Sequence, residues 1–158
     1  IDPAVARAMR ATDSAAFAGR AVTTLSGGER ARVLLARALA VEAPVLICDE
    51  PVAALDPRHQ LAVMGVLAAE ARHGRAVAVV MHDLALAARY ADRVAILAEG
   101  RLVAAGTPLE VLTPAMLAEV FGVASLREER PDGLLVLPWR PLAPEPRLTD
   151  DEERHTSN

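Results

Sequence analysis

The sequence predicts an α/β fold, in which short buried strands alternate with amphipathic helices. Two apolar runs, "VLICDE" and "AVAVVMH", end abruptly in side chains that carry charge or titrate. Segments with helical patterning and clear start signals precede and follow each run. Apolar runs of this length are typical of strands whose two faces are both covered in a parallel sheet. Their alternation with helices therefore predicts a parallel sheet core.

Residues 1–40 are predicted to be mainly helical. Asp2 and Pro3 supply an N-cap and a first-turn proline, and Pro44 lies beyond the last helix of this segment. The expected elements are a helix to about Arg10, a short helix over Asp13–Phe17, a loop over Gly19–Leu25 and a helix over Ser26–Ala40.

Two strands with a helix between them are predicted to form the core of the sheet. The first strand lies in "PVLICDEP" and the second in "RAVAVVMHD", and both are expected to be buried on both faces. Asp56-Pro57 starts the connecting helix and Gly74 closes it. His59, on the surface of that helix, is expected to be solvated. A short helix in "LALAARYAD" follows the second strand.

Two hairpins, separated by two short helices, are predicted for the rest of the chain. "RVAILAEGRLVAAG" turns at its "EG" pair, and "LREERPDGLLVLPW" turns at "PDG". Threonine-proline pairs at Thr107 and Thr113 start the two helices. Trp139 is expected to anchor the second hairpin on the core. The proline-rich and then charged segment from Ala143 is expected to be disordered.

The composition argues against several classes of protein. The net charge is −4 and no basic block stands out, which disfavours nucleic acid or anionic lipid as a direct partner. The single cysteine, Cys48, fits a reducing compartment, and no apolar run reaches the ~20 residues that cross a bilayer. Without a signal-peptide pattern, the expected location is the cytoplasm. All 17 basic residues are arginine, so a lysine-dependent step needs another chain or segment.

Two adjacent glycines, Gly27 and Gly28, stand at the start of the helix in "LSGGERARVLLARAL". Each costs a helix about 1 kcal/mol relative to alanine, so their presence needs a reason. One interpretation is a capping box, in which Ser26 is the N-cap and Glu29 reaches back to it. The other is that bare backbone N–H groups at the helix start bind a phosphate. The pattern alone leaves both interpretations open.

Asp49, Glu50 and His82 stand at the ends of the two core strands. The carboxyl ends of neighbouring parallel strands meet at one edge of a sheet, where α/β proteins bind ligands. One carboxylate at such an edge can hold Mg²⁺, while the other orients or deprotonates a water molecule. The alternative is that the strand ends merely become polar at the surface.

Taken together, these motifs resemble those of the ATP-binding cassette (ABC) ATPases. "LSGGE" is similar to the family's signature motif, "VLICDEP" to its Walker B strand, "ALDP" to its D-loop and "VMHD" to its switch histidine. The resemblance extends to about Gly122 and implies a P-loop NTPase-like parallel sheet core with part of the ABC helical subdomain. The implied division is residues 1–40 for the helical subdomain, 41–122 for the RecA-like core, 123–142 for an accessory hairpin and 143–158 for a disordered tail.

The resemblance implies that Asp49 supports Mg²⁺, that Glu50 is the general base for the attacking water, and that His82 contacts the γ-phosphate of ATP. The family's phosphate loop, G-x-x-x-x-G-K-[ST], and its glutamine loop are absent from this sequence. In the family both precede the signature motif, so the chain resembles the C-terminal part of a cassette. Alone, it is expected to hydrolyse ATP negligibly.

A head-to-tail homodimer is also implied. Ser26, Gly27 and Gly28 would bind the γ-phosphate of an ATP held by the opposing subunit, and Asp56 would couple the two sites, while Glu29 would support the helix start. The C-terminal half looks most like the ATPases of importers for iron-siderophores, haem or cobalamin. Such ATPases hydrolyse ATP to drive transport and lie on the inner face of the cell membrane, held there by transmembrane permease subunits.

Two other functions stay open. One is a non-catalytic interaction module that completes a partner's ATPase site, and the other is a soluble ABC ATPase of DNA repair or translation. The acidic balance and the importer-like C-terminal half disfavour the second. An upstream phosphate loop and neighbouring permease genes would favour the importer subunit over both.

Overall fold

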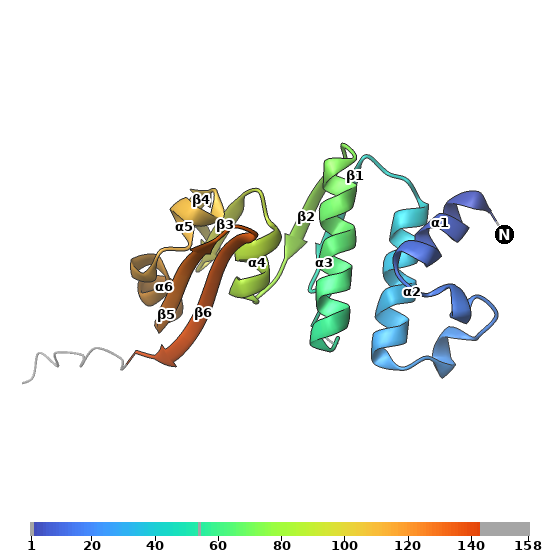
Figure 1. Cartoon of the computed structure of the whole chain (residues 1–158), viewed down its shortest axis with the longest axis horizontal. Coiled ribbons are helices and arrows are strands. Elements are labelled where there is room, and N and C mark those ends of the chain that lie inside the picture. Colours follow the sequence, from blue (N-terminus) through green and yellow to red (C-terminus); the bar gives the residue numbers. More distant parts are fainter. Residues whose placement is uncertain (1, 54, 143–158) are drawn as a thin grey trace, which may run out of the picture.

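The computed structural model describes residues 2–53 and 55–142, and it is an α/β structure with three small sheets. Figure 1 shows three groups of elements along the long axis: the helical pair α1–α2, then β1, β2 and α3, then the elements from α4 to β6. The helices are α1 (Pro3–Ala11), α2 (Gly27–Ala40), α3 (Pro57–Arg72), α4 (Leu84–Tyr90), α5 (Pro108–Val111) and α6 (Pro114–Phe121). The strands are β1 (Val45–Asp49), β2 (Ala76–Val80), β3 (Val94–Ala98), β4 (Arg101–Gly106), β5 (Val123–Arg130) and β6 (Gly133–Pro141).

The helical start signals in the sequence are confirmed. The Asp2 side chain accepts a hydrogen bond from the Ala4 N–H at 2.7 Å and caps α1. The short helix expected over Asp13–Phe17 is a single 3₁₀ turn over Ala15–Phe17, and the expected loop before α2 contains another over Val22–Thr24. Arg32 of α2 donates to the Asp13 backbone carbonyl at 2.8 Å, which fixes this connection against the helix.

β1 and β2 form the predicted parallel pair. Their register joins Val45 to Ala76 and Asp49 to Val80, with α3 as the crossover between them. Asp56 caps α3 at its start, and Gly74, with φ of +96°, follows its end. This φ lies in the left-handed region that glycine adopts without steric cost.

The expectation that both faces of this sheet are buried is wrong. Along β1, buried Leu46 and Cys48 alternate with exposed residues, and Ile47 is 74% exposed. β1 and β2 form a two-stranded sheet, and α2 and α3 cover one of its faces. No element of the described chain covers the other face. The continuous apolar run therefore belongs to a strand with an apolar face in contact with solvent.

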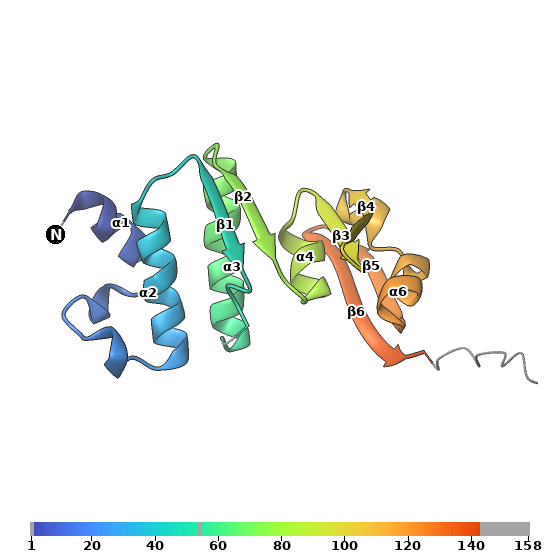
Figure 2. The same ribbon diagram turned by 180° about the vertical axis from the view of Figure 1, so that it is seen from behind.

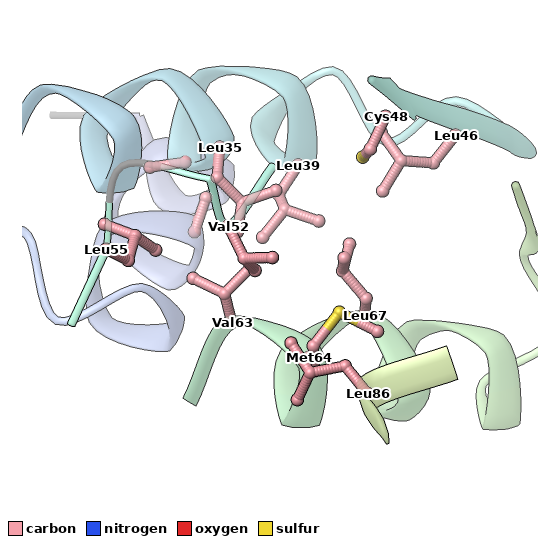
Figure 3. Close-up of a cluster of buried hydrophobic side chains, with 12 residues drawn as sticks. Leu35, Leu39, Leu46, Cys48, Val52, Leu55, Val63, Met64, Leu67 and Leu86 are labelled. Carbon is pink, nitrogen blue, oxygen red and sulfur yellow. The ribbon is translucent and has the colours of Figure 1, made fainter. Parts of the chain in front are cut away.

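Two clusters of buried side chains hold the molecule together. The first joins α1, α2, β1, α3 and α4, and the second joins α4, β3, α5, α6 and β6. Figure 3 shows Leu35 and Leu39 of α2 pointing toward Val52 and Val63 in the first cluster. Cys48 lies in this cluster, as expected, and burial raises the pKa of its thiol.

The division of the chain into a helical subdomain, a RecA-like core and an accessory hairpin, with boundaries at residues 40 and 122, stays a prediction.

Both predicted hairpins are present in the C-terminal part. β3 and β4 are joined by Glu99 and Gly100, both with positive φ, which matches the twist of a two-residue hairpin turn. Thr107 and Thr113 cap α5 and α6 as expected. Trp139, however, is 66% exposed, so its predicted role as an anchor on the core is wrong. The predicted disordered tail, 143–158, lies outside the described residues.

Candidate functional site

The motif residues lie at element ends on one side of the molecule. In Figures 1 and 2, α2 begins, β1 ends and α3 begins on the same side of the central group, and β2 runs toward that side. The start of α2 carries Ser26 to Gly28, the end of β1 carries Asp49 and Glu50, and Asp56 caps α3. Among the described residues, no hydrogen bond or ion pair joins the start of α2 to Glu50 or His82.

A capping box organises the start of α2. The Ser26 hydroxyl accepts from the Glu29 N–H at 3.3 Å, and the Glu29 carboxylate accepts from the Ser26 N–H at 2.7 Å. The backbone hydrogen bond from Ser26, followed by the hydroxyl of the same residue, lowers the pKa of Glu29. The capping interpretation is thus correct as geometry, and Glu29 supports the helix start.

The capping box does not account for the two glycines. Among the described residues, a Cβ built on Gly27 would meet nothing outside the start of its own helix within 4 Å, and one on Gly28 would meet Leu55 at an ordinary contact distance of 3.4 Å. Neither glycine has a positive φ. Alanine would therefore fit both positions and would favour the helix. Nothing within the described chain requires glycine here, and Gly27 is exposed.

Glu50 and His82 form a pair beyond the parallel strands. The Glu50 Oε1 atom lies 3.2 Å from His82 Nε2, and this oxygen is buried without a hydrogen bond of good geometry. The Glu50 N–H continues the sheet ladder by donating to the Val80 carbonyl at 3.0 Å. Glu50 has φ of +47°, a conformation uncommon outside glycine and associated with functional sites. β2 itself ends at Val80, so His82 stands in the loop that follows.

Asp49 ends β1 on the face of the sheet that is exposed. Its carboxylate has no hydrogen-bond or ion-pair partner among the described residues, and these residues contain no cluster of three metal-ligating side chains. Mg²⁺ that is bound with phosphates needs only one or two protein carboxylates and keeps several waters. An unpaired aspartate at this edge fits that type of site, whereas a site built wholly from protein ligands does not.

Asp56 is held by two contacts to His59. Its carboxylate accepts from the His59 N–H at 3.0 Å, and the second oxygen lies 2.7 Å from His59 Nδ1. These two contacts, with the backbone one larger, lower the pKa of Asp56. The surface position expected for His59 is confirmed in part, since its side chain is 31% exposed, but it is also paired with Asp56. Its spacing of three residues from an N-cap aspartate is the signal that could have revealed the pair.

The comparisons with known proteins agree with these motifs. Residues 2–53 match the ABC transporter family. The chain is 55% identical to the hemin import ATP-binding protein HmuV of Streptomyces coelicolor over 141 residues, which is 88% of this chain and 50% of that protein. It is 53% identical to the cobalamin import ATP-binding protein BtuD of Halobacterium salinarum over 74% of this chain and 30% of that protein. The chain thus spans half or less of the length of these relatives.

Solved structures show the same fold. An inward-facing metal-chelate type ABC transporter matches with a TM-score of 0.75 and 25% identity, over 87% of this chain and 57% of that one. The ATP-binding cassette MJ0796, in a dimeric post-hydrolysis state with ADP and Pi, matches with a TM-score of 0.60 and 30% identity, over 65% of this chain and 45% of that one. In the part of the chain that the structure describes, no helix has the length and apolar character of a membrane span. The family match, the relatives and the shared fold agree, and over most of its length the chain is similar to the ATPases of ABC transporters.

Proposed function

We propose that this chain supplies part of the ATP-hydrolysing subunit of an importer for haem or a related metal chelate. The substrate class is inferred from two kinds of relative, which are hemin import and cobalamin import ATP-binding proteins. The observation that carries the chemistry is the Glu50–His82 pair beyond two neighbouring parallel strands. Haem is preferred over cobalamin because the HmuV relative matches a larger share of the chain.

Glu50 is the general base in this proposal. Among the described residues its buried Oε1 has no well-formed hydrogen-bond partner, so it is free to accept a proton from a water that attacks the γ-phosphate. His82, whose side chain is 89% exposed, contacts that phosphate from the neighbouring strand end. Asp49 holds Mg²⁺, which neutralises charge on the phosphate oxygens.

The start of α2 acts on an ATP held by a second ATPase subunit. Ser26, Gly27 and Gly28 offer hydroxyl and backbone N–H groups to the γ-phosphate, and the two glycines leave room for it. Asp56 at the start of α3 couples the two sites of a head-to-tail dimer. The dimeric cassette structures among the structural matches support this arrangement.

The proposed place of action is the cytoplasmic face of the membrane. The metal-chelate transporter among the structural matches supports attachment to permease subunits. The chelate would then pass through those subunits and not through this chain.

A fused cassette tests the hydrolytic function. The N-terminal half of the Streptomyces coelicolor relative, which is expected to carry the phosphate loop, is joined ahead of Asp2 of this chain. This chain and the matched part of the relative are 55% identical, so the interface with the rest of the relative is expected to be retained. The fusion is expected to hydrolyse Mg²⁺-ATP, and Glu50→Gln should lower kcat by about 100-fold or more, since general-base catalysis contributes roughly that much.

ATP binding is the control for this experiment. Glu50→Gln should leave the Kd of ATP near that of the parent fusion, because the side chain acts on water and not on the adenosine. A Glu119→Gln variant, at an exposed position of α6, should keep the parent kcat. A Glu50→Gln fusion that turns over as fast as the parent would contradict the proposed role of Glu50. A folded fusion that binds ATP without turnover would favour the non-catalytic interaction module.

A further inference from the structure

Leu55 lies between the starts of two helices that carry motif residues. Its side chain is 9% exposed, and its Cδ2 atom is 3.4 Å from the position that a Cβ on Gly28 would occupy. The next residue, Asp56, is the N-cap of α3. The side chain that lies next to Gly28 at the start of α2 therefore belongs to the residue beside the cap of α3.

Hydrogen bonds to the Val52 carbonyl tie the turn before Leu55 to α3. The Leu55 N–H donates to the Val52 carbonyl at 3.1 Å, and the Gln60 side-chain amide of α3 donates to the same carbonyl at 3.2 Å. Val52 is 3% exposed and packs in the first cluster beside Leu35 of α2, as Figure 3 shows. A shift of Leu55 relative to α3 would therefore break the hydrogen bonds to the Val52 carbonyl or expose the Val52 side chain to solvent.

We propose that Leu55 is a positioning residue that keeps the start of α2 in a fixed place relative to Asp56. This inference rests on the proposed function, in which the start of α2 acts on the ATP of a second subunit and Asp56 couples the two sites. Because packed interiors hold few voids, the Leu55 side chain transmits the position of one helix start to the other. A small residue at position 28 allows this contact without displacing Leu55.

Backbone resonances of the 158-residue chain test the contact directly. Leu55→Ala is compared with Leu39→Ala. Both variants remove the same atoms from the first cluster, but Leu39 lies roughly three turns of α2 away from Gly28. Leu55→Ala is expected to shift the amide signals of Gly27, Gly28 and His59, whereas Leu39→Ala leaves them in place. Leu55→Met should return these signals toward the parent positions. Equal shifts in the two alanine variants would overturn the proposal.

Kinetics of the fused cassette give a second readout. Leu55→Ala is expected to lower kcat by about 10- to 100-fold, the loss that a small misplacement of catalytic groups produces, with KM for ATP nearly unchanged. Leu39→Ala should keep the parent kcat, and Leu55→Met should recover most of it. A loss of the same size in Leu55→Ala and Leu39→Ala would contradict a positioning role.

The two proposals fail separately. A parent fusion without ATPase activity would count against the proposed function, while the resonance comparison still decides the role of Leu55. Should Leu55→Ala not fold, Leu55→Val removes fewer atoms from the same position, and the same comparison with Leu39→Val then decides. Unshifted Gly27 and Gly28 signals in a folded Leu55→Val chain would reject the contact.

Discussion

At the residue scale, three carboxylates at helix starts make the stability of the fold depend on pH through their hydrogen bonds. Glu29, Asp56 and Glu110 each accept a backbone N–H, from Ser26, His59 and Thr107 respectively, and this contact is the main reason that the pKa of each is lowered. A lowered folded-state pKa stabilises the fold above the unfolded-state pKa and ceases to do so as the pH falls through the folded-state pKa. Acid should therefore weaken the starts of α2, α3 and α5, and the first two of these carry motif residues.

The pH dependence of unfolding checks this account. Stability to urea is expected to fall as the pH drops below the ordinary pKa values of 4.5 for glutamate and 3.8 for aspartate. Replacing the carboxyls, as Glu29→Gln, Asp56→Asn and Glu110→Gln, should flatten this dependence, whereas Glu119→Gln should not. A triple variant that keeps the parent pH profile would show that the caps do not carry the effect.

The local structure around the candidate site residues was predictable from the sequence, because its signals are local. A capping box, a strand end with two acids and an N-cap before proline are each readable within four or five residues. The proximity of Leu55 to Gly28 was missed, since these positions are far apart in sequence and leave no local pattern. The anchoring role predicted for Trp139 failed for the same reason, as tertiary packing decides which face of a hairpin is covered.

At the element scale, β1 shows why an apolar run does not reveal how many faces are covered. "VLICD" reads as a strand buried on both faces, and the structure places Leu46 and Cys48 against α2 and α3 while Val45 and Ile47 face solvent. The exposed apolar face continues on β2 at Val80, which is 56% exposed. An uncovered apolar surface of this kind promotes association between copies of the chain.

Neighbouring substitutions on β1 distinguish the two faces. Leu46→Ala should destabilise the chain by about 2–5 kcal/mol, because it leaves a cavity in the core. Ile47→Thr should change stability little and should lower aggregation, because the side chain is 74% exposed and threonine keeps a high strand preference. Urea unfolding and light scattering measure the two effects. A larger loss of stability for Ile47→Thr than for Leu46→Ala would contradict the one-sided burial.

At the scale of the whole molecule, the chain carries acid, histidine and glycine motifs without a lysine. All 17 of its basic residues are arginine, and the phosphate-loop pattern is absent from the 158 residues. The chain also spans about half the length of the hemin import relative from Streptomyces coelicolor. The α/β class and the parallel β1–β2 pair were predictable from the sequence, whereas the arrangement of three separate two-stranded sheets was not.

The isolated chain is therefore expected to be inactive. Purified alone, it should release phosphate from Mg²⁺-ATP no faster than its own Glu50→Gln variant. Phosphate release that Glu50→Gln abolishes in the isolated chain would show that the residues present suffice for catalysis.

The central claim is that the start of α2 from one subunit and the Glu50–His82 pair from the other act on the γ-phosphate of the same ATP. Mixing two inactive fused cassettes tests this claim most directly. One fusion carries Glu50→Gln and the other Ser26→Arg, and each homodimer alone should be inactive. In a head-to-tail mixed dimer both defects fall on one site, so the other site is intact and phosphate release should reappear on mixing. Failure to recover activity in mixed dimers that form and bind ATP would contradict this account.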